Sequence, residues 1–166
     1  MTSFAVTEQQ LDAFVRHYPR FARSEAGIVR LIRAVDKLLA DNANHHLRDY
    51  GLSLSEYNAL SMLGASPDGM SVSELANLTG EKPSNTTRLT DQLVRKQLLL
   101  RTVSENDRRV WLVKLSPLGK ELLNELLPGL CADLEDVFAP LDSQQRQTLE
   151  QLLKVLYSQV EGRVRG

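Results

Sequence analysis

The sequence predicts a mainly α-helical fold that carries one small β-hairpin. Helix-forming residues such as Leu, Ala, Gln, Glu and Arg dominate, and aromatic residues make up only 5% of the chain. Apolar residues recur at spacings of three and four over long stretches, which is the period of an amphipathic helix. Two short runs, 98–103 and 110–115, break this period and flank a polar segment, which predicts a hairpin with a charged tip.

The first fifty residues predict two helices of unequal length. A short helix is expected at about 8–17, before the break at Pro19. A long amphipathic helix is expected at 25–49, and Gly51 is a typical helix stop. Its apolar residues follow helical spacing: Ile28, Leu31, Ile32, Val35, Leu38 and Leu39.

The centre of the chain carries three helix starts in close succession. Ser53 with Glu56, and Ser71 with Glu74, have the spacing of capping boxes. The second of these helices is short, because Gly80 ends it, and a third helix is expected from Pro83 to about Lys96. Helix, short helix, helix and hairpin is the order of a winged helix-turn-helix.

Two further helices are expected after the hairpin. Ser116, followed by proline, starts one that runs to about Phe138, with a kink expected at Pro128. Asp142 and Ser143 cap a last amphipathic helix. The chain is thus expected to divide into parts of one dimerisation domain at 1–50 and 117–166 and a winged helix-turn-helix domain at 51–116.

Several classes of protein are disfavoured by composition. The first ten residues lack the basic start and apolar run of a signal peptide, and no apolar stretch reaches membrane-spanning length, so a cytoplasmic protein without a membrane partner is expected. Cys131 is the only cysteine, which excludes an intrachain disulfide. Its leucine-rich surroundings and the nearby Asp133 favour an inert buried thiol over a redox sensor.

Positive charge is concentrated in the centre of the chain. Residues 71–115 contain eight Lys or Arg and five Asp or Glu, a net charge of +3, so the remainder carries −4 of the total of −1. Phosphate binding depends on local potential rather than on net charge. The distribution is compatible with double-stranded DNA as a partner.

The helix expected from Pro83 has the composition of a DNA-reading helix. Its first turns carry five polar residues, which are Ser84, Asn85, Thr86, Thr87 and Arg88. In a helix-turn-helix, residues at the N-terminal end of the second helix contact base edges in the major groove, and the helix from Pro83 takes that place here. Arg88 is either a solvated helix residue or a DNA contact, and we favour a phosphate contact. Arg95 and Lys96 are either helix-terminus charges or distal phosphate contacts.

The tip of the predicted hairpin carries Asp107, Arg108 and Arg109. A guanidinium on such a wing can enter a narrow minor groove, where A·T-rich sequence raises the negative potential. Asp107 can hold the arginine fork by a charge-assisted hydrogen bond. Trp111, which follows, is expected to pack in the core between hairpin and helices.

A small-molecule pocket is suggested by a second group of residues. His45 and His46 point about 100° apart on a helix, so they make a poor metal pair, but one of them can face an effector pocket. Tyr57, Asn58 and Met62 either line such a pocket or belong to the ordinary core. No metal site and no cofactor is expected.

The span 54–122 resembles the MarR family of bacterial transcription regulators, and in particular its multidrug-efflux repressor (EmrR-like) branch. The matching pieces are Leu54-Ser55-Glu56-Tyr57, Ser73-Glu74-Leu75-Ala76, the run from Asn85 to Leu93, Asp107-Arg108-Arg109, and Leu115-Ser116-Pro117-Leu118-Gly119. The run Glu81-Lys82 departs from the pattern, because the family often has Ser or Thr as this cap, which puts the start of the helix and the role of Ser84 in doubt.

The resemblance implies a triangular homodimer in which the first and last helices interlock. It implies that Arg109 enters the minor groove with Asp107 as its orienting partner, and that residues 84–88 read bases. It also implies control by a small phenolic or other aromatic acid, which binds between the dimer helices and the head and weakens DNA binding.

The predicted function is therefore a ligand-responsive repressor that binds a pseudo-palindromic operator. An activator or dual regulator with the same DNA-binding mode remains an alternative, because the position of the operator decides whether bound protein represses or activates transcription. An enzyme is not expected, since the sequence has no phosphate loop, ligand cluster or nucleophile motif. A winged helix used for protein interaction would need apolar residues where 84–88 are polar.

Overall fold

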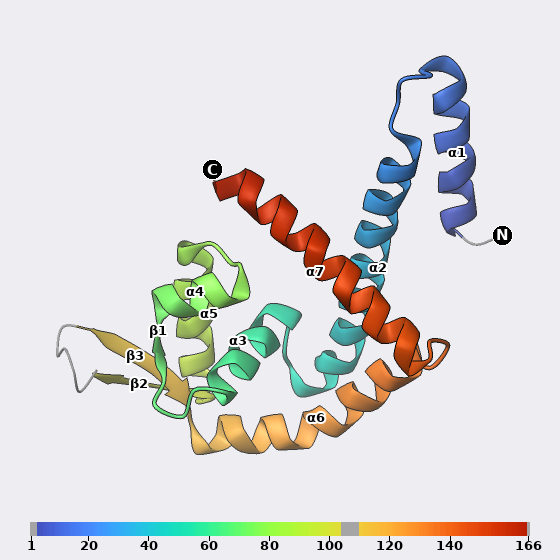
Figure 1. The fold of residues 1–166 in the computed structure, drawn as a ribbon. Coiled ribbons are helices and arrows are strands. Elements are labelled where there is room, and N and C mark those ends of the chain that lie inside the picture. The colour runs from blue at the N-terminus through green and yellow to red at the C-terminus, as the bar shows by residue number, and fades with distance from the viewer. Residues whose placement is uncertain (1–2, 104–109, 166) are drawn as a thin grey trace. The chain divides into compact units, whose positions relative to one another are not determined.

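A computed structural model describes residues 3–103 and 110–165 (Figure 1). The chain forms two compact units, Met1–Leu123 and Asn124–Gly166, which are described separately. The observed order of elements agrees with a mainly helical chain that carries a small sheet. The predicted division into a dimerisation domain (1–50 and 117–166) and a winged helix-turn-helix domain (51–116) stays a prediction.

The first unit opens with two helices that pack side by side, α1 (Ser3–His17) and α2 (Arg23–Leu47) (Figure 1). Arg23, at the start of α2, is 2.8 Å from a carboxylate oxygen of Asp12 in α1. Helix α2 ends in a 3-10 turn, η1 (Arg48–Tyr50). The predicted stop at Gly51 is confirmed, because this glycine has the left-handed φ of 64° that reverses the chain.

The head of the molecule consists of α3 (Leu54–Gly64), β1 (Met70–Ser71), α4 (Val72–Thr79) and α5 (Pro83–Arg95). Both predicted capping boxes are confirmed. Ser53 and Ser71 each accept a hydrogen bond from the backbone N–H of the glutamate three residues on, and each glutamate side chain accepts one in return. Gly80 ends α4 with a φ of 69°.

The predicted hairpin forms from β2 (Leu99–Val103) and β3 (Trp111–Leu115), which pair from Leu99↔Leu115 to Val103↔Trp111. The sheet contains a third strand that the sequence did not indicate: β1 pairs with β3 and gives the order β1-β3-β2. Two residues are too few to show alternation. This short strand joins the α3–α4 connection to the hairpin.

The core of the head lies between its helices and the sheet. Leucines from successive elements are fully buried there: Leu60, Leu63, Leu75, Leu93 and Leu99, with Val113 of β3. Thr86 and Thr90 of α5 are also fully buried. Their hydroxyls donate to the backbone oxygens of Lys82 and Thr87, which satisfies them without a distant partner.

Helix α6 (Pro117–Phe138) starts where predicted. The Ser116 hydroxyl accepts from the Gly119 N–H at 2.9 Å and donates to the Gln97 carbonyl at 2.6 Å, so one buried side chain caps α6 and ties it to the end of α5. Pro128 lies inside the helix and cannot donate a backbone hydrogen bond there.

The second unit holds the end of α6 and the last helix, α7 (Ser143–Arg165). At the start of α7, the Asp142 N–H donates to the Gln145 side-chain oxygen and the Gln145 N–H donates to the Asp142 carboxylate. This is a capping box made by Asp and Gln in place of Ser and Glu. Apolar side chains line α7 and are exposed in the single chain, including Leu149, Leu152, Leu153, Leu156 and Val160.

Two packing predictions are wrong. Trp111 was expected in the core, but its side chain is 61% exposed at the first residue of β3. Cys131 was expected to be buried, but it is exposed on α6. None of the described helices is long and apolar enough to cross a membrane.

Candidate nucleic-acid interface

One side of α5 is packed and the opposite side faces solvent. Thr86, Leu89, Thr90 and Leu93 are buried against the head, at the spacing of a single helix face. The opposite face carries the side chains of Ser84, Arg88 and Arg95, all exposed. The helix therefore presents polar and cationic groups outward along its whole length.

Four of the five residues predicted to read bases lie on the accessible surface at the start of α5, namely Ser84, Asn85, Thr87 and Arg88. Thr86 does not lie with them. Its side chain is fully buried and its hydroxyl donates to the Lys82 carbonyl at 3.2 Å. Thr86 thus packs the helix against the head and does not belong to its exposed face.

The start of α5 lacks a side-chain cap, as the sequence indicated. Lys82 stands at the cap position without a capping hydrogen bond, and Pro83 occupies the first turn. The backbone N–H groups of Ser84 and Asn85 precede the first α-helical donor, Thr86. Groups of this kind at a helix N-terminus favour an anionic partner.

Glu81, the acidic residue that departs from the family pattern, is held by two neutral donors. The Ser55 hydroxyl donates to Oε1 at 3.0 Å, and the Asn85 side-chain amide lies 3.4 Å from Oε2. The first contact joins the start of α3 to the α4–α5 connection. Glu81 therefore ties two helix starts together beside the exposed face of α5.

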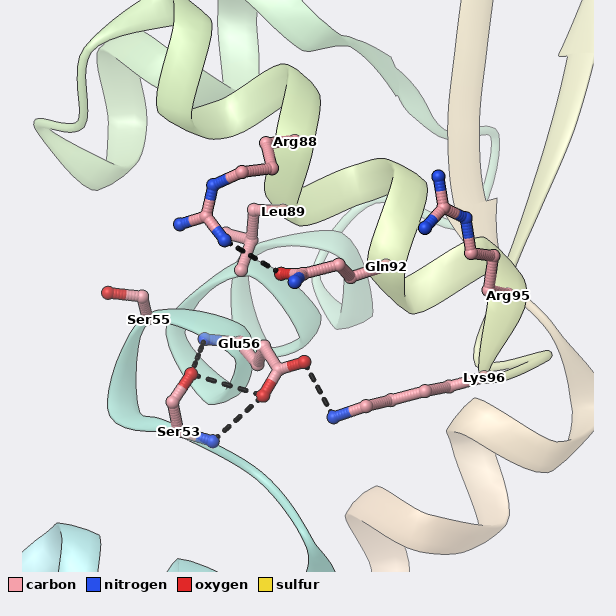
Figure 2. A pocket seen from close by; sticks show the side chains of 8 residues that line it. All are labelled: Ser53, Ser55, Glu56, Arg88, Leu89, Gln92, Arg95 and Lys96. Atoms are coloured by element: carbon pink, nitrogen blue, oxygen red, sulfur yellow. Dashed lines mark hydrogen bonds and ion pairs between the residues drawn. The ribbon is translucent and has the colours of Figure 1, made fainter.

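An open hollow separates the start of α3 from the outer face of α5 and has a volume of about 510 Å³ (Figure 2). We call it the α3–α5 groove. It is lined by Ser53, Ser55, Glu56, Arg88, Leu89, Gln92, Arg95 and Lys96. Within it, Arg88 Nη1 donates to Gln92 Oε1 at 3.3 Å.

A partly buried ion pair lines the α3–α5 groove. Lys96 Nζ lies 2.6 Å from Glu56 Oε1 and also donates to the Gly51 carbonyl at 2.8 Å. The other carboxylate oxygen of Glu56 accepts from the Ser53 N–H and hydroxyl (Figure 2). The pair therefore joins the end of α5 to the junction between α2 and α3.

The surroundings of Glu56 stabilise its ionised form. Burial by itself would raise the pKa of this carboxyl, but the hydrogen bonds from Lys96 and Ser53, together with the positive charge of Lys96, lower the pKa below its ordinary value. Glu56 is therefore charged at neutral pH, and Lys96 balances that charge.

The other flank of α5 faces the sheet. Arg101 of β2 forms an ion pair with Asp91 of α5. Arg101 also lines a smaller hollow of about 350 Å³ with Val72, Trp111 and Val113. The exposed Trp111 therefore stands at the wing side of the head, beside the start of α4.

The predicted wing residues Asp107, Arg108 and Arg109 lie outside the described residues. The last described pair before them is Val103 with Trp111. Their expected role in the minor groove stays a prediction.

The predicted effector residues are only partly brought together. His45 is exposed and lines a hollow of about 540 Å³ at the α2–α3 junction, together with Asp41, Asn44, Arg48, Gly51, Leu52 and Ser53. His46 is half-buried, with its ring 5.8 Å from that of Tyr50. Tyr57 is half-buried on α3, and Asn58 and Met62 are exposed there. None of these last three lines the hollow that contains His45.

No cluster of three His, Cys, Asp or Glu that could hold a metal ion occurs within 3–103 and 110–165.

Comparison with known proteins identifies the same region. The sequence profile of the MarR family matches residues 52–111. The chain is 29% identical over 161 residues to the transcriptional repressor MprA of Escherichia coli (strain K12), an alignment that covers 96% of this chain and 92% of the relative.

Solved structures share the fold. AbsC, a MarR family transcriptional regulator from Streptomyces coelicolor, superposes with a TM-score of 0.78 at 25% identity, covering 86% of this chain and 97% of AbsC. A mutant of MarR from E. coli, complexed with operator DNA, gives a TM-score of 0.72 at 25% identity, covering 78% and 92% of the two chains.

Proposed function

Because this chain belongs to the MarR family of transcription regulators, we propose that it is a repressor that binds a pseudo-palindromic DNA operator as a homodimer and is released by a small aromatic or phenolic acid. The observation that carries the proposal is the exposed outer face of α5, with Ser84, Asn85, Thr87 and Arg88 at its uncapped start. The relative MprA is a repressor, and the structurally similar MarR was solved on its operator.

In this proposal the start of α5 enters the major groove. Ser84, Asn85 and Thr87 present short donors and acceptors to base edges, and Arg88 contacts the backbone. The residues Asp107, Arg108 and Arg109 follow β2 in the sequence, and we propose that Arg109 enters the adjacent minor groove with Asp107 as its partner.

The homodimer is supported by the apolar surface of the two long helices. In the single chain, α2 exposes Ile28, Val29, Leu31, Ile32, Val35 and Leu38, and α7 exposes a second leucine-rich row. A contiguous apolar stripe on a long helix indicates a protein partner. A second copy of the chain is the partner that a palindromic operator requires, with half-site centres about 10 base pairs apart.

The effector site is proposed at the α2–α3 junction. His45 lines the hollow there, and Arg48 in the same hollow offers a cation to a carboxylate. His46, Tyr57, Asn58 and Met62 belong to the two helices that meet at this junction. An acid bound there would act on the head through Gly51 and Ser53, which contact Lys96 and Glu56.

The test is a titration of the full chain into a labelled duplex from upstream of its own gene, with excess non-specific DNA, followed by a panel of small aromatic acids. Tight, salt-sensitive binding that an acid reverses would support the whole proposal. Specific binding that no acid disturbs would retain DNA binding and refute the effector.

If the upstream duplex is not bound, random duplexes are screened in the same way. Failure to select any sequence would refute operator binding and favour a winged helix used for protein interaction. The same duplex is then placed before a reporter gene, and expression is compared with and without the protein. Lower expression indicates repression, and higher expression indicates activation.

A further inference from the structure

Glu81 places a negative charge beside the start of α5, and no cation balances it. The residue precedes Lys82 at the cap position and is half-buried. Within residues 3–103 and 110–165, no lysine or arginine lies within ion-pair distance of its carboxylate. An unbalanced carboxylate repels the phosphates of every duplex, whatever the sequence. A contribution of Glu81 to DNA binding must therefore come from discrimination between sequences.

The Glu81 carboxylate is anchored on one side by α3. The Ser55 hydroxyl donates to Oε1 at 3.0 Å, and Ser55 is a half-buried residue in the first turn of that helix. The second oxygen, Oε2, lies toward α5, where the Asn85 side-chain amide approaches it to 3.4 Å. Glu81 thus connects a fixed hydroxyl of α3 to an exposed amide of α5.

The carboxylate determines which way round the Asn85 amide lies. A carboxylate only accepts hydrogen bonds, so the amide nitrogen faces it and the amide oxygen points away. Rotation of the amide by 180° would bring Oδ1 against Oε2, which places two acceptors in contact. At 3.4 Å the hydrogen bond itself is weak, so the preference comes mainly from the repulsion in the rotated state.

The accessible edge of Asn85 matches one base. The side chain is exposed, so its oxygen and its second N–H remain available to DNA. In the major groove adenine presents the N6 donor beside the N7 acceptor, and an asparagine amide can bind both. Guanine presents two acceptors there, and thymine an acceptor beside a methyl group. A rotated amide would direct its N–H groups at the N6 donor, so the match depends on orientation.

We infer that Glu81 is a positioning residue that orients the Asn85 amide, so that Asn85 reads one adenine in each half-site. The inference rests on the proposed operator binding and adds a residue that contacts no base itself. Glu81 lowers affinity for all duplexes through its charge and raises the preference for adenine at one position.

The test measures base preference at every position of one half-site. Each base pair of the selected operator is replaced by the other three, and the full chain is titrated into each duplex at one salt concentration. The wild-type chain should prefer adenine at one position by about 5- to 150-fold, and Asn85→Ala should lose that preference.

Glu81→Gln is the informative variant. It keeps the side-chain length and an oxygen that can accept from Ser55, but its amide both donates and accepts, so either orientation of the Asn85 amide satisfies it. The preference for adenine should fall at the position read by Asn85 and at no other. Binding to a scrambled duplex should become tighter, because one negative charge is lost.

Two further variants separate positioning from other roles. If Glu81 acts through Asn85, adding Glu81→Gln to Asn85→Ala should change the preference at that position no further. Ser55→Ala removes the anchor without altering the start of α5, and it should weaken the same adenine preference. Glu121→Gln removes one exposed carboxylate from α6 and is the control, which should leave every base preference unchanged.

Several results would overturn the assignment. Unchanged adenine preference in Glu81→Gln would remove the positioning role. A further loss at the same base pair in the double variant would make Glu81 a base reader in its own right. Equal weakening on the operator and the scrambled duplex would indicate a purely structural role. Failure of the wild-type chain to select any sequence would instead refute the proposed function, and it is seen without a variant.

Discussion

Replacing Lys96 by methionine tests the partly buried ion pair between the end of α5 and Glu56 of α3. The change removes the ammonium group and keeps most of the aliphatic stem, so the Glu56 carboxylate loses its partner while the packing is largely retained. The Glu56 side chain is only 9% exposed, so water cannot fully replace the lost contact.

The expected cost follows from the exposure of the two partners. A hydrogen bond to a charged group contributes about 1.5–3 kcal/mol, and we reduce this to about 1–2 kcal/mol because the Lys96 side chain is 40% exposed and solvent screens it. For a chain of this size the loss corresponds to a decrease in Tm of about 2–8 °C.

The loss should depend on pH. The pKa of Glu56 is lower in the folded chain than its ordinary value of 4.5, so the stabilisation is fully present above pH 4.5 and disappears as the pH falls through the folded-state pKa. The difference in Tm between wild type and Lys96→Met should therefore be largest near pH 7 and shrink toward pH 3.

The assay is thermal unfolding followed by circular dichroism at one fixed protein concentration, since the Tm of the proposed dimer would depend on concentration. Lys154→Met is the control, because Lys154 pairs with Glu150 where both side chains are more than 60% exposed, and its loss should change Tm little. Equal Tm values for Lys96→Met and wild type at pH 7, or a difference that persists unchanged to pH 3, would refute the reasoning.

Three further changes test other parts of the molecule. Arg109→Ala should weaken operator binding by about 1–3 kcal/mol in a fluorescence titration, and an unchanged affinity would remove the wing contact. Gly119→Ala should lower stability by about 1–3 kcal/mol in denaturant unfolding, because its Cβ would collide with the Leu98 carbonyl oxygen. Leu38→Glu should yield a monomer in analytical ultracentrifugation, since this 67% exposed leucine lies on the apolar stripe of α2.

Matched controls accompany two of these changes. Gly64→Ala adds the same methyl group where the nearest atoms are 3.4 Å and 3.7 Å away, in side chains, so it should be tolerated. Leu78→Glu introduces the same charge at a 60% exposed leucine of α4 and should leave the oligomeric state unchanged. A dimer that survives Leu38→Glu at micromolar concentration would contradict the role given to α2.

Local features of the fold were predictable because each is encoded within a few residues. A capping box needs only a serine and a glutamate three positions apart, and both boxes at Ser53 and Ser71 form. Glycine at a left-handed position is an equally local signal, as at Gly80. The strand β1 was missed because two residues carry no period.

Features that depend on tertiary contacts were not predictable. Nothing local links Lys96 to Glu56, which lie forty residues apart, so Lys96 could only be assigned to a helix terminus or a phosphate. Trp111 was placed in the core from its residue type and Cys131 from its leucine-rich surroundings, but both are exposed in the single chain.

Helix α5 combines a feature that the sequence predicted with one that it did not. Composition identified residues 84–88 as polar, but the helix has only one outer face, and its rotation turns Thr86 inward against the head. The spacing to the buried leucines Leu89 and Leu93 indicates this orientation. Thr86 lies three residues before Leu89 and seven before Leu93, so all three share one face of the helix. Gln92 also lines the α3–α5 groove, and no sequence motif pointed to it.

The central claim is that the exposed face of α5 recognises a DNA sequence. The most direct measurement is the ratio of dissociation constants of the full chain for its selected duplex and for a scrambled duplex of identical composition, at physiological salt. The account predicts a ratio of about 10³ or more in favour of the selected sequence. Equal affinity for the two duplexes would contradict it.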